Sequence, residues 1–596
     1  MKAQQSKTNQ KSKVAFQDIW KTWQVLPHTK KGRAVVVFLM IIFGTTLEML
    51  SIGLVLPFLA ALTGDAGGYQ LELINKLKHT FIFINDSSLL ISLLFILLGG
   101  FVIKNTFLTI LSWIQSKFIF DTQSDLATEL LESYLAQPYT FHLQKNTAEL
   151  INNLQVELNL FIVYMLSPSL LLLAEFLVVG GLVSLLFVFE PIGTLLVASF
   201  FLVFGFLFQL LTKNRVGRWG KKRQYEESLR MKHAKQALSA VKEIKLYRKE
   251  DFFISRYAVH TKNSLTMNQR SSFIHSLTRL WLEIIALSGI VLLYLIMMFQ
   301  GKENEAILPT VGLFAAVAFR LLPSLNRIMG ALNQLRFGAT VVDLIYHEFS
   351  KFRSNENQLF NKKISEKWRF SEQVELKNIY FTYPNNTKHS LSNINVSIRR
   401  GQMVGFIGES GSGKSTLINL FLGLLQADSG KLSVDGVDIN LTLEQWQKNI
   451  GYVPQNIYLT DDKLKNNIAF GVKESEIDSK ALTRAIQSAQ LDKLVRELPD
   501  GLDTIVGEHG DRLSGGQRQR IGIARALYND PDILVFDEAT SALDYETEKD
   551  VIEAINVLHR NKTIVVIAHR ESAVEKCDVI YRLASGHIIE IDKKLN

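Results

Sequence analysis

Long apolar segments in the first 335 residues decide what this chain can fold into. Each segment is close to or longer than the roughly 20 residues that a helix needs to cross the hydrocarbon core of a bilayer. The sequence therefore predicts six transmembrane helices, at residues 34–62, 88–113, 161–189, 192–211, 273–299 and 306–329. With 596 residues, the chain also has room for a domain outside the lipid.

Basic residues set the predicted orientation of these helices. The first 33 residues carry eight Lys or Arg residues against the single acid Asp18, which places this end in the cytoplasm. Both termini and the loops 114–160 and 212–272 are then cytoplasmic. These basic loops explain the net charge of +9, so we expect no nucleic-acid partner. We also expect no cleavable signal peptide, because the polar, basic N-terminal tail is not a short n-region.

The polarity pattern divides the chain into four parts. We expect an N-terminal tail at residues 1–33, a helical membrane domain at 34–335, a polar helical linker at 336–367 and a soluble α/β domain at 368–596. The only cysteine is Cys577, which excludes intrachain disulfides and cysteine-based metal clusters.

The strongest motif of the soluble part is "GESGSGKS", residues 408–415. An apolar, strand-like stretch precedes it and a helix-like stretch follows it, which is the context of a phosphate-binding P-loop. Backbone N–H groups and a helix N-terminus would face the phosphates. Lys414 would reach the β and γ phosphates, and the Ser415 hydroxyl would bind Mg²⁺. A chance glycine turn is the alternative reading.

A second motif, "DILVFDEATSALD", is an apolar strand that ends in Asp537 and Glu538. A buried strand would deliver both carboxylates to the edge of the sheet that carries the P-loop. Asp537 could then hold Mg²⁺, and Glu538 could polarise the attacking water. The alternative is that one of the two acids caps a helix.

A third motif, "LSGGQRQRIGIARAL", places Ser514, Gly515, Gly516 and Gln517 at the start of a basic helix. This is a second anion-binding terminus. One domain has no need of two γ-phosphate sites, so we expect this one to close over the ATP of a second subunit.

Together these motifs resemble the nucleotide-binding domain of an ATP-binding-cassette (ABC) transporter, over residues 368–593. The resemblance implies that Tyr383 of "FTYP" stacks on adenine and that Gln455 of "YVPQNIYL" senses Mg²⁺. It also implies that His569 of "VIAHR" contacts the γ-phosphate and that Asp544 lies at the dimer seam. The third motif, residues 513–527, corresponds to the signature of this family, and residues 504–510 resemble the exporter-specific loop beside it.

The resemblance implies the cofactors ATP and Mg²⁺ and a full set of site residues. The catalytic residues would be Glu538, His569, Gln455 and Lys414, and the metal ligands Ser415, Gln455 and Asp537. The nucleotide-binding residues would be Tyr383, Gly408, Glu409, Ser410, Gly411, Ser412, Gly413, Lys414, Ser415, Thr416, Gln455, Ser514, Gly515, Gly516, Gln517 and Asp537.

The fold class that follows is an α-helical six-span transmembrane exporter domain followed by an α/β P-loop nucleotide-binding domain. One membrane half and one cassette per chain imply a dimer, most simply a homodimer. Two ATP molecules between two cassettes would pull them together, and hydrolysis would let them part. Residues 136–150 and the segment around 221–235 resemble the regions that couple this motion to the membrane domain.

Charges inside the apolar segments bear on the cargo. Lys104, Arg279, Arg320 and Arg327 fall in or near the cytoplasmic half of the membrane, counting 1.5 Å per residue. They could line a cavity that captures a phosphate or pyrophosphate headgroup, since Arg suits bidentate phosphate contacts. Alternatively they snorkel to the headgroups, and Arg279 pairs with Glu283 along its own helix.

The stretches "LEMLSIGLVLPFLA", "TRLWLE" and "FRLLPSLNRI" resemble the membrane domain of bacterial lipid-linked oligosaccharide flippases (PglK-like). The resemblance implies that Arg279, Arg320, Arg327 and, more weakly, Lys104 line the cavity near a pyrophosphate linker. It also implies a bacterial inner-membrane protein with its cassette in the cytoplasm. Residues 69–81 have the amphipathic pattern of a short outside helix, which would lie at the lipid interface or pack on the protein.

These features favour a flippase for a polyprenyl-pyrophosphate glycan or similar glycolipid, with membrane lipids as partners. An exporter of peptides or hydrophobic drugs on the same scaffold is the alternative. A soluble cassette protein of DNA repair or translation does not agree with six spans.

Overall fold

The structure is a computed structural model. It describes residues 14–54, 58, 89–189, 191–299, 304–359, 370–384, 386–507, 510, 512–538, 553, 558, 559 and 561–593. By their contacts, these residues form two compact units. The first extends to residue 137 and continues from 145 to 359, and the second joins residues 138–144 to those from 370 onward.

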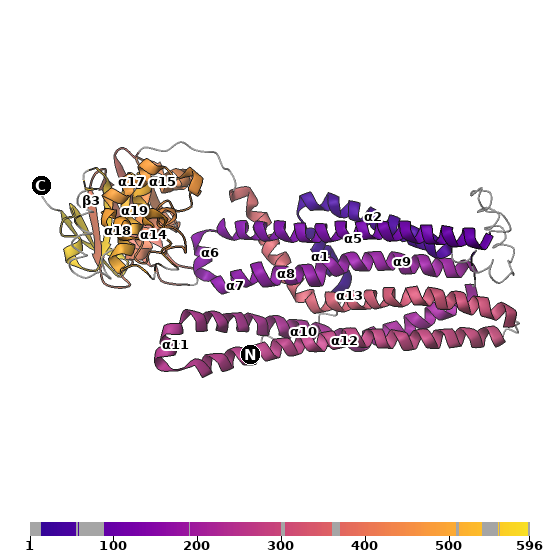
Figure 1. The fold of residues 1–596 in the computed structure, drawn as a ribbon. Coiled ribbons are helices and arrows are strands. Elements are labelled where there is room, and N and C mark those ends of the chain that lie inside the picture. The colour runs from indigo at the N-terminus through magenta and orange to yellow at the C-terminus, as the bar shows by residue number, and fades with distance from the viewer. Residues whose placement is uncertain are drawn as a thin grey trace. The chain divides into compact units, whose positions relative to one another are not determined.

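The described part of the first unit is helical throughout. Its helices are α1 (Val14–Val25), α2 (His28–Gly53), α5 (Leu89–Leu135), α7 (Thr147–Asn152), α8 (Leu158–Phe161), α9 (Ser167–Phe189), α10 (Pro191–Ser239), α11 (Val241–Tyr247), α12 (Glu250–Phe299) and α13 (Asn304–Leu359). Two π-helical turns, Asn153–Glu157 and Ile162–Leu166, flank α8. Figure 1 shows α10 and α12 side by side, with α11 joining them at one end.

Five of the described helical stretches are long and apolar enough to cross a membrane: His28–Gly53, Leu90–Leu135, Thr147–Ser184, Pro191–Ser239 and Glu250–Phe299. The predicted sixth span, residues 306–329, falls within α13 and is not among these five; the side chains of residues 304–316 lie outside the described part. The sixth span therefore stays a prediction. The predicted outside helix at 69–81 also lies outside the described residues.

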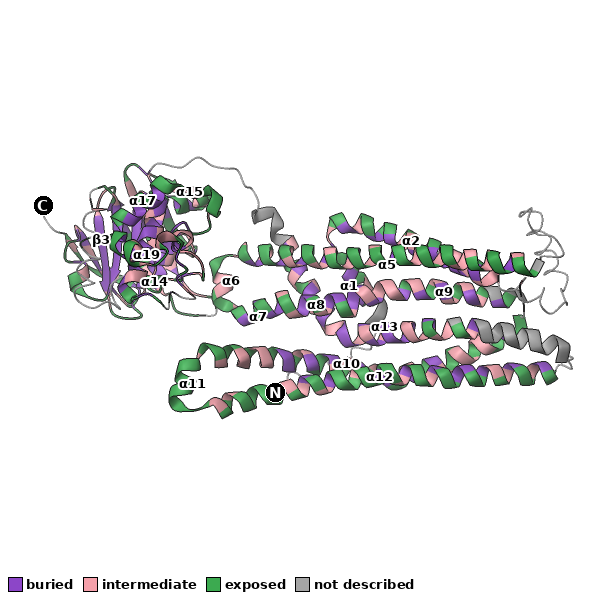
Figure 2. Ribbon diagram, in the orientation of Figure 1, coloured by how far each residue is buried: buried purple, intermediate pink, exposed green. Residues whose placement is uncertain are grey.

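Exposed residues follow the long helices along much of their length (Figure 2), and many of these residues are apolar. On α10, for example, Leu202 is 73% and Phe206 is 66% exposed. Such a surface is unfavourable in water and suits contact with lipid chains. Residues 336–359, placed in a linker by the sequence analysis, continue α13, and their apolar side chains Phe337, Val341 and Ile345 are buried.

Arg353 of α13 fixes the C-terminal end of α1. Its guanidinium donates to the carbonyl oxygens of Gln24 and Val25 at 2.9 Å each, and its Nε lies 2.7 Å from the Glu129 carboxylate of α5. A cation at the carbonyl end of a helix satisfies unpaired acceptors and complements the helix dipole. One side chain thus connects three helices.

The second unit consists of α6 (Tyr139–Gln144) and an α/β domain with two sheets. The larger sheet has the strand order β10-β9-β3-β8-β7-β6, in which β9, β3, β8, β7 and β6 are parallel. The smaller sheet is antiparallel, with the order β2-β1-β4-β5. The strands are β1 (Gln373–Phe381), β2 (Leu391–Arg399), β3 (Met403–Gly408), β4 (Ser429–Val434), β5 (Val437–Asp438), β6 (Ile450–Val453), β7 (Ile533–Asp537), β8 (Thr563–Ala568), β9 (Val579–Ala584) and β10 (His587–Lys593).

Two apolar cores hold this domain together. The helices are α14 (Lys414–Phe421), α15 (Leu443–Lys448), α16 (Leu464–Ile468), α17 (Ser479–Ser488), α18 (Asp492–Glu497) and α19 (Gly515–Tyr528). One core includes α14 and side chains of both sheets, and the other includes α16, α17 and α19. The central strands β7 and β8 are buried along almost their whole length, as expected for parallel strands covered on both faces. The predicted α/β fold of this domain is confirmed.

Gly220 tests how closely α10 and α13 pack. A Cβ at this position would lie 2.0 Å from the carbonyl oxygen of Phe337, whereas a Cβ at Gly217 would meet its nearest atom at 4.0 Å. We expect Gly220→Ala to destabilise the protein by about 1 to 3 kcal/mol through overpacking, with Gly217→Ala as the matched control. Thermal unfolding in detergent measures both. Equal midpoints would contradict this packing.

Asp18 of α1 gives a prediction about pH. Burial, together with the nearby Asp343, raises the pKa of Asp18 to about 6, and Lys21 opposes this. The folded state therefore binds a proton that the unfolded state releases between about pH 4 and pH 6, so stability falls as the pH rises through this window. Asp18→Asn should stabilise the protein at pH 8, by an amount on the order of 1 kcal/mol after solvent screening.

The stabilisation by Asp18→Asn should shrink as the pH falls from 8 to 5, which thermal unfolding at several pH values would show. Asp251→Asn, at an exposed position of α12, serves as the control. A pH-independent effect of Asp18→Asn would contradict the assigned pKa.

Candidate functional site

The loop between β3 and α14 forms an anion cradle. Gly411 and Gly413 have positive φ angles of 81° and 106°, which L side chains rarely adopt. A Cβ at Gly408 would lie 2.3 Å from the carbonyl oxygen of Leu583, so the loop passes too close to the neighbouring strand for any side chain. These glycines let the backbone N–H groups and the start of α14 approach one anion.

Lys414 lies folded over this loop. Its ammonium group donates to the carbonyl oxygens of Gly408 at 2.7 Å and Glu409 at 2.9 Å. Burial lowers the pKa of Lys414, while the carboxylates of Glu538 and Asp537 oppose the shift. The cation is therefore held at the cradle by weak acceptors that a phosphate could replace.

Asp537 and Glu538 lie at the carboxyl end of β7. The pairing of β7 with β8 and of β8 with β3 brings them to the same sheet edge as the cradle. Burial raises the pKa of Asp537, and the Tyr452 hydroxyl, which donates to its carboxylate at 3.1 Å, opposes this. The sequence analysis gave Tyr452 no role, although it belongs to the same motif as Gln455.

Glu538 is held at both carboxylate oxygens. His569 Nε2 lies 2.6 Å from Oε1, and Gln455 Nε2 donates to Oε2 at 2.7 Å. The backbone of Glu538 has a φ angle of 49°, in the left-handed region, and its N–H donates to the carbonyl oxygen of Ile567 at 3.0 Å. Three of the four residues predicted to be catalytic, Glu538, His569 and Gln455, thus meet at one carboxylate.

A cleft of about 520 Å³ opens beside this group. It is lined by Tyr383, Asn386, Lys388, His389, Ser390, Ser410, Gly411, Gly413, Lys414, Ser415, Thr416, Glu538, His569, Ser585 and Gly586. The Tyr383 hydroxyl lies 3.2 Å from the Thr416 hydroxyl, which brings the predicted adenine-stacking ring to the cradle. Sequence reasoning missed Asn386, Lys388, His389, Ser390 and the turn at Ser585 and Gly586, which carry no motif of their own.

The oxygen groups at this edge suit Mg²⁺. Ser415, Asp537 and Gln455 offer a hydroxyl, a carboxylate and an amide, and hard cations prefer oxygen ligands. Within the described residues, no group of three or more His, Cys, Asp or Glu side chains could hold a metal. Mg²⁺ at a nucleotide needs no such cage, because phosphates and water supply most of its ligands.

Ser514 caps α19 within its own chain. Its hydroxyl accepts from the Gln517 N–H at 3.3 Å, and the Gln517 side chain accepts from the Ser514 N–H at 2.8 Å. Among the described residues that line the cleft, none comes from 514–517. The signature therefore does not reach the P-loop of its own chain, as a site completed by a second copy requires. Asp544 lies outside the described residues.

The four predicted cargo-binding cations have different surroundings. Arg327 Nε lies 2.8 Å from the Glu175 carboxylate of α9, and Glu175 is almost fully buried. Arg279 pairs with Glu283 at 3.7 Å along α12, and the Lys104 ammonium lies 4.3 Å from the Phe101 ring centre. Arg320 lies in α13, but its side chain is outside the described part. The three cations whose side chains are described, Lys104, Arg279 and Arg327, thus each contact a different partner.

Two family models match the chain. The model described as "ABC transporter transmembrane region" matches residues 34–318, and the model described as "ABC transporter" matches residues 391–541.

Curated relatives and one solved structure agree with these matches. A protein of Ralstonia nicotianae named ATP-dependent lipid A-core flippase is 31% identical over 471 residues, 78% of each chain. A Vibrio cholerae protein of the same name is 36% identical over 285 residues, 47% of this chain and 48% of that one. The solved structure of a bacterial Atm1-family ABC exporter with ATP bound has a TM-score of 0.74 at 21% identity, covering 94% of this chain and 95% of that one.

Glu538→Gln tests the assignment of the catalytic base. A general base contributes about 10²- to 10⁴-fold to rate, so we expect ATP turnover to fall at least about 100-fold while ATP still binds. Steady-state hydrolysis and binding of a fluorescent nucleotide measure the two effects. Glu571→Gln, which removes only the contact with Arg582 in the same domain, should leave turnover near that of the unmodified protein. Rapid hydrolysis by Glu538→Gln would refute the assignment.

Proposed function

This chain belongs to the ABC transporter family, and from that premise we propose that it is a flippase that moves an anionic glycolipid from the inner to the outer leaflet. As a member of the family it is an ATP-driven exporter whose ATPase domain is coupled to transport through a membrane. The proposal adds the class of cargo, the direction of movement and a homodimeric assembly. It also places the protein in a bacterial inner membrane, with the cassette in the cytoplasm.

The proposed homodimer rests on the geometry of the signature. Ser514 to Gln517 do not line the cleft of their own chain, and an anion-binding helix start of this kind fits the γ-phosphate of ATP on a second copy. Two ATP molecules would then be enclosed between two cassettes. Glu538 would polarise the attacking water in each site, and hydrolysis would let the cassettes part.

The proposed cargo rests on the relatives and on charge inside the membrane unit. The relatives are named as lipid A-core flippases, and lipid A-core, like a polyprenyl-pyrophosphate glycan, is an anionic glycolipid. Arg327 and Glu175 form an ion pair on helices that face lipid. Charged groups at such positions are costly to keep, which makes them candidates for a cargo pathway.

Arg327 is the described cation that supports this proposal best. Its side chain is 41% exposed although its Nε and Nη2 atoms are buried, and Glu175 at 7% cannot move into solvent without unpacking. A guanidinium offers five N–H donors, so an anionic headgroup could bind those that Glu175 does not use. Arg279 pairs with Glu283. Arg327, which lies near the end of the predicted sixth span, could instead snorkel to the headgroups.

An exporter of peptides or hydrophobic drugs is the second candidate. The exposed apolar surfaces of the long helices do not distinguish it from a lipid flippase. The cationic positions distinguish the two functions, because an uncharged hydrophobic cargo would not need guanidinium groups inside the membrane to bind it. Cargo assays with variants of these arginines therefore separate the two functions.

Arg320→Ala should slow glycolipid flipping in proteoliposomes at least about tenfold, because one charge-assisted hydrogen bond contributes about 1.5 to 3 kcal/mol. Basal ATPase activity should stay within about twofold, since the substitution changes none of the nucleotide motifs. The double variant Arg327→Met with Glu175→Gln should slow flipping to a similar extent and leave basal ATPase activity similarly unchanged. It removes the ion pair without leaving a buried carboxylate unpaired. The two cargoes to assay are lipid A-core and a polyprenyl-pyrophosphate glycan.

Arg218→Ala is the matched control. Arg218 is an exposed arginine of α10 whose Nε donates to the Asn214 carbonyl oxygen of its own helix. Unchanged flipping of both cargoes by Arg320→Ala and by the double variant would refute the headgroup role. Transport of an uncharged drug by the unmodified protein, with no transport of either glycolipid, would favour the second candidate.

A further inference from the structure

Tyr452 and Asp537 meet on one face of the larger sheet, although they belong to different strands. In the register of β6 and β7, Tyr452 lies opposite Val535. Side chains two residues apart on a strand point to the same face, so Asp537 follows Val535 on the face that carries Tyr452. The Tyr452 hydroxyl bridges this diagonal and donates to Asp537 Oδ2 at 3.1 Å.

The same face of the sheet carries the P-loop helix. Tyr452 and Val535 pack in the apolar core that includes α14. Their chain neighbours Val453 and Phe536 pack in the other core, as the alternation along a strand requires. Tyr452 therefore approaches Asp537 from the side of the sheet on which we expect the phosphates to bind.

The Asp537 carboxylate needs a partner to hold its plane. The χ2 torsion of Asp has no narrow staggered wells, so a carboxylate at a strand end can turn through a wide range of angles. Tyr452 fixes Oδ2, whereas within the described part of the chain no hydrogen bond reaches Oδ1. One oxygen is thus held, and the other is left to bind a further partner.

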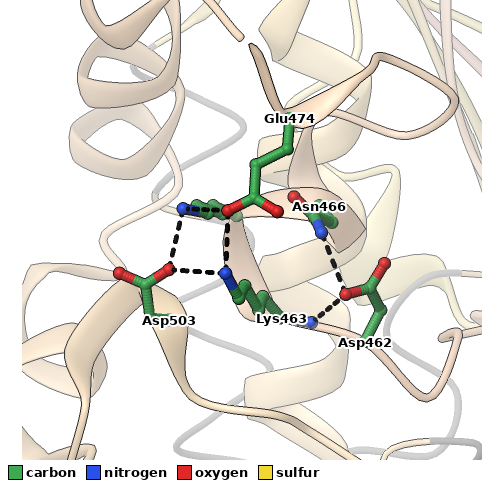
Figure 3. Close-up of polar contacts among 6 residues, drawn as sticks. Asp462, Lys463, Asn466, Glu474 and Asp503 are labelled. Atoms are coloured by element: carbon green, nitrogen blue, oxygen red, sulfur yellow. Dashed lines mark hydrogen bonds and ion pairs between the residues drawn. The ribbon is translucent and has the colours of Figure 1, made fainter.

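A surface cluster shows a different way to hold a carboxylate (Figure 3). Asp503 and Glu474 each pair with both Lys463 and Lys465, at distances between 2.7 and 3.4 Å. Ammonium groups so close to a carboxylate would repel a metal ion that approached it. Asp537 forms no ion pair within the described residues and is held by a neutral hydroxyl. Tyrosine therefore orients this carboxylate without adding positive charge beside it.

We propose that Tyr452 is a positioning residue for the Mg²⁺ of the ATP site, whose hydroxyl fixes the Asp537 carboxylate so that Oδ1 faces the metal. Tyr452 is not among the described residues that line the nucleotide cleft, so it acts through Asp537 and not on the nucleotide. Loss of a hydrogen bond to a metal-binding carboxylate typically lowers metal affinity about 10- to 100-fold. The inference rests on the predicted Mg²⁺ role of Asp537, and neither on the proposed cargo nor on the proposed homodimer.

Tyr452→Phe tests this inference, because it removes the hydroxyl and keeps the ring. The measurement is the affinity of the full chain for a fluorescent, non-hydrolysable ATP analogue, once with Mg²⁺ and once with EDTA. We expect the variant to bind the Mg²⁺ complex about tenfold more weakly than the unmodified protein does. Its affinity for the metal-free analogue should be unchanged, which also shows that the cleft is intact.

Asp537→Asn links the effect to the metal ligand. This variant should lose most of the affinity that Mg²⁺ adds, and Tyr452→Phe should have no further effect in its background. If Asp537→Asn keeps that affinity, the predicted metal role of Asp537 is wrong and the inference fails with it. If Asp537→Asn loses that affinity and Tyr452→Phe does not, the metal role stands and the inference alone is overturned.

Two variants of the same domain are matched controls. Tyr528→Phe removes a hydroxyl that accepts from the Asp478 N–H at 2.9 Å, and Asp503→Asn removes a carboxylate of the surface cluster. Both should bind the analogue as the unmodified protein does, with Mg²⁺ and with EDTA. An equal loss of affinity in the two conditions for Tyr452→Phe would overturn the inference, because it would show that Tyr452 supports the cleft and not the metal.

Discussion

The site depends on the direction of four adjacent strands. Because β6, β7, β8 and β3 are parallel, their carboxyl ends meet at one edge, where such sheets bind ligands. Gln455 follows β6, Glu538 follows β7, His569 follows β8 and the P-loop follows β3. Chain segments more than 100 residues apart thereby reach one carboxylate. A shift of one residue in the β7 register would turn its side chains to the opposite faces.

The membrane unit follows a different constraint. Its helices satisfy their own backbone groups, which is what lipid demands, and so their surfaces can be apolar. The few charged side chains of this unit are therefore the groups that are energetically unfavourable among these helices. The pair of Arg327 and Glu175 keeps a guanidinium among apolar helices by giving it a buried counter-ion. A buried pair of this kind stabilises little by itself, so a structural role does not account for it well.

The fold class and the sheet edge could be predicted from sequence because glycine spacing, strand-terminal acids and apolar segment lengths are local signals. Contacts between distant segments carry no such signal. Tyr452 on Asp537, Arg525 on Asn467 and Glu175 on Arg327 each join side chains that only the folded topology brings together. Residues 336–359 looked like a linker because polar residues outnumber apolar ones there, yet the apolar minority faces the helical core.

The capping box at Ser514 has a consequence for how the protein assembles. Its hydroxyl and the Gln517 side chain each accept from a backbone N–H at the start of α19, so this helix start is capped within a single chain. In the proposed homodimer, the same hydroxyl would also contact a phosphate of the ATP bound to the other copy. A single chain would therefore have a capped helix start, and only assembly of the proposed homodimer would complete the site that hydrolyses ATP.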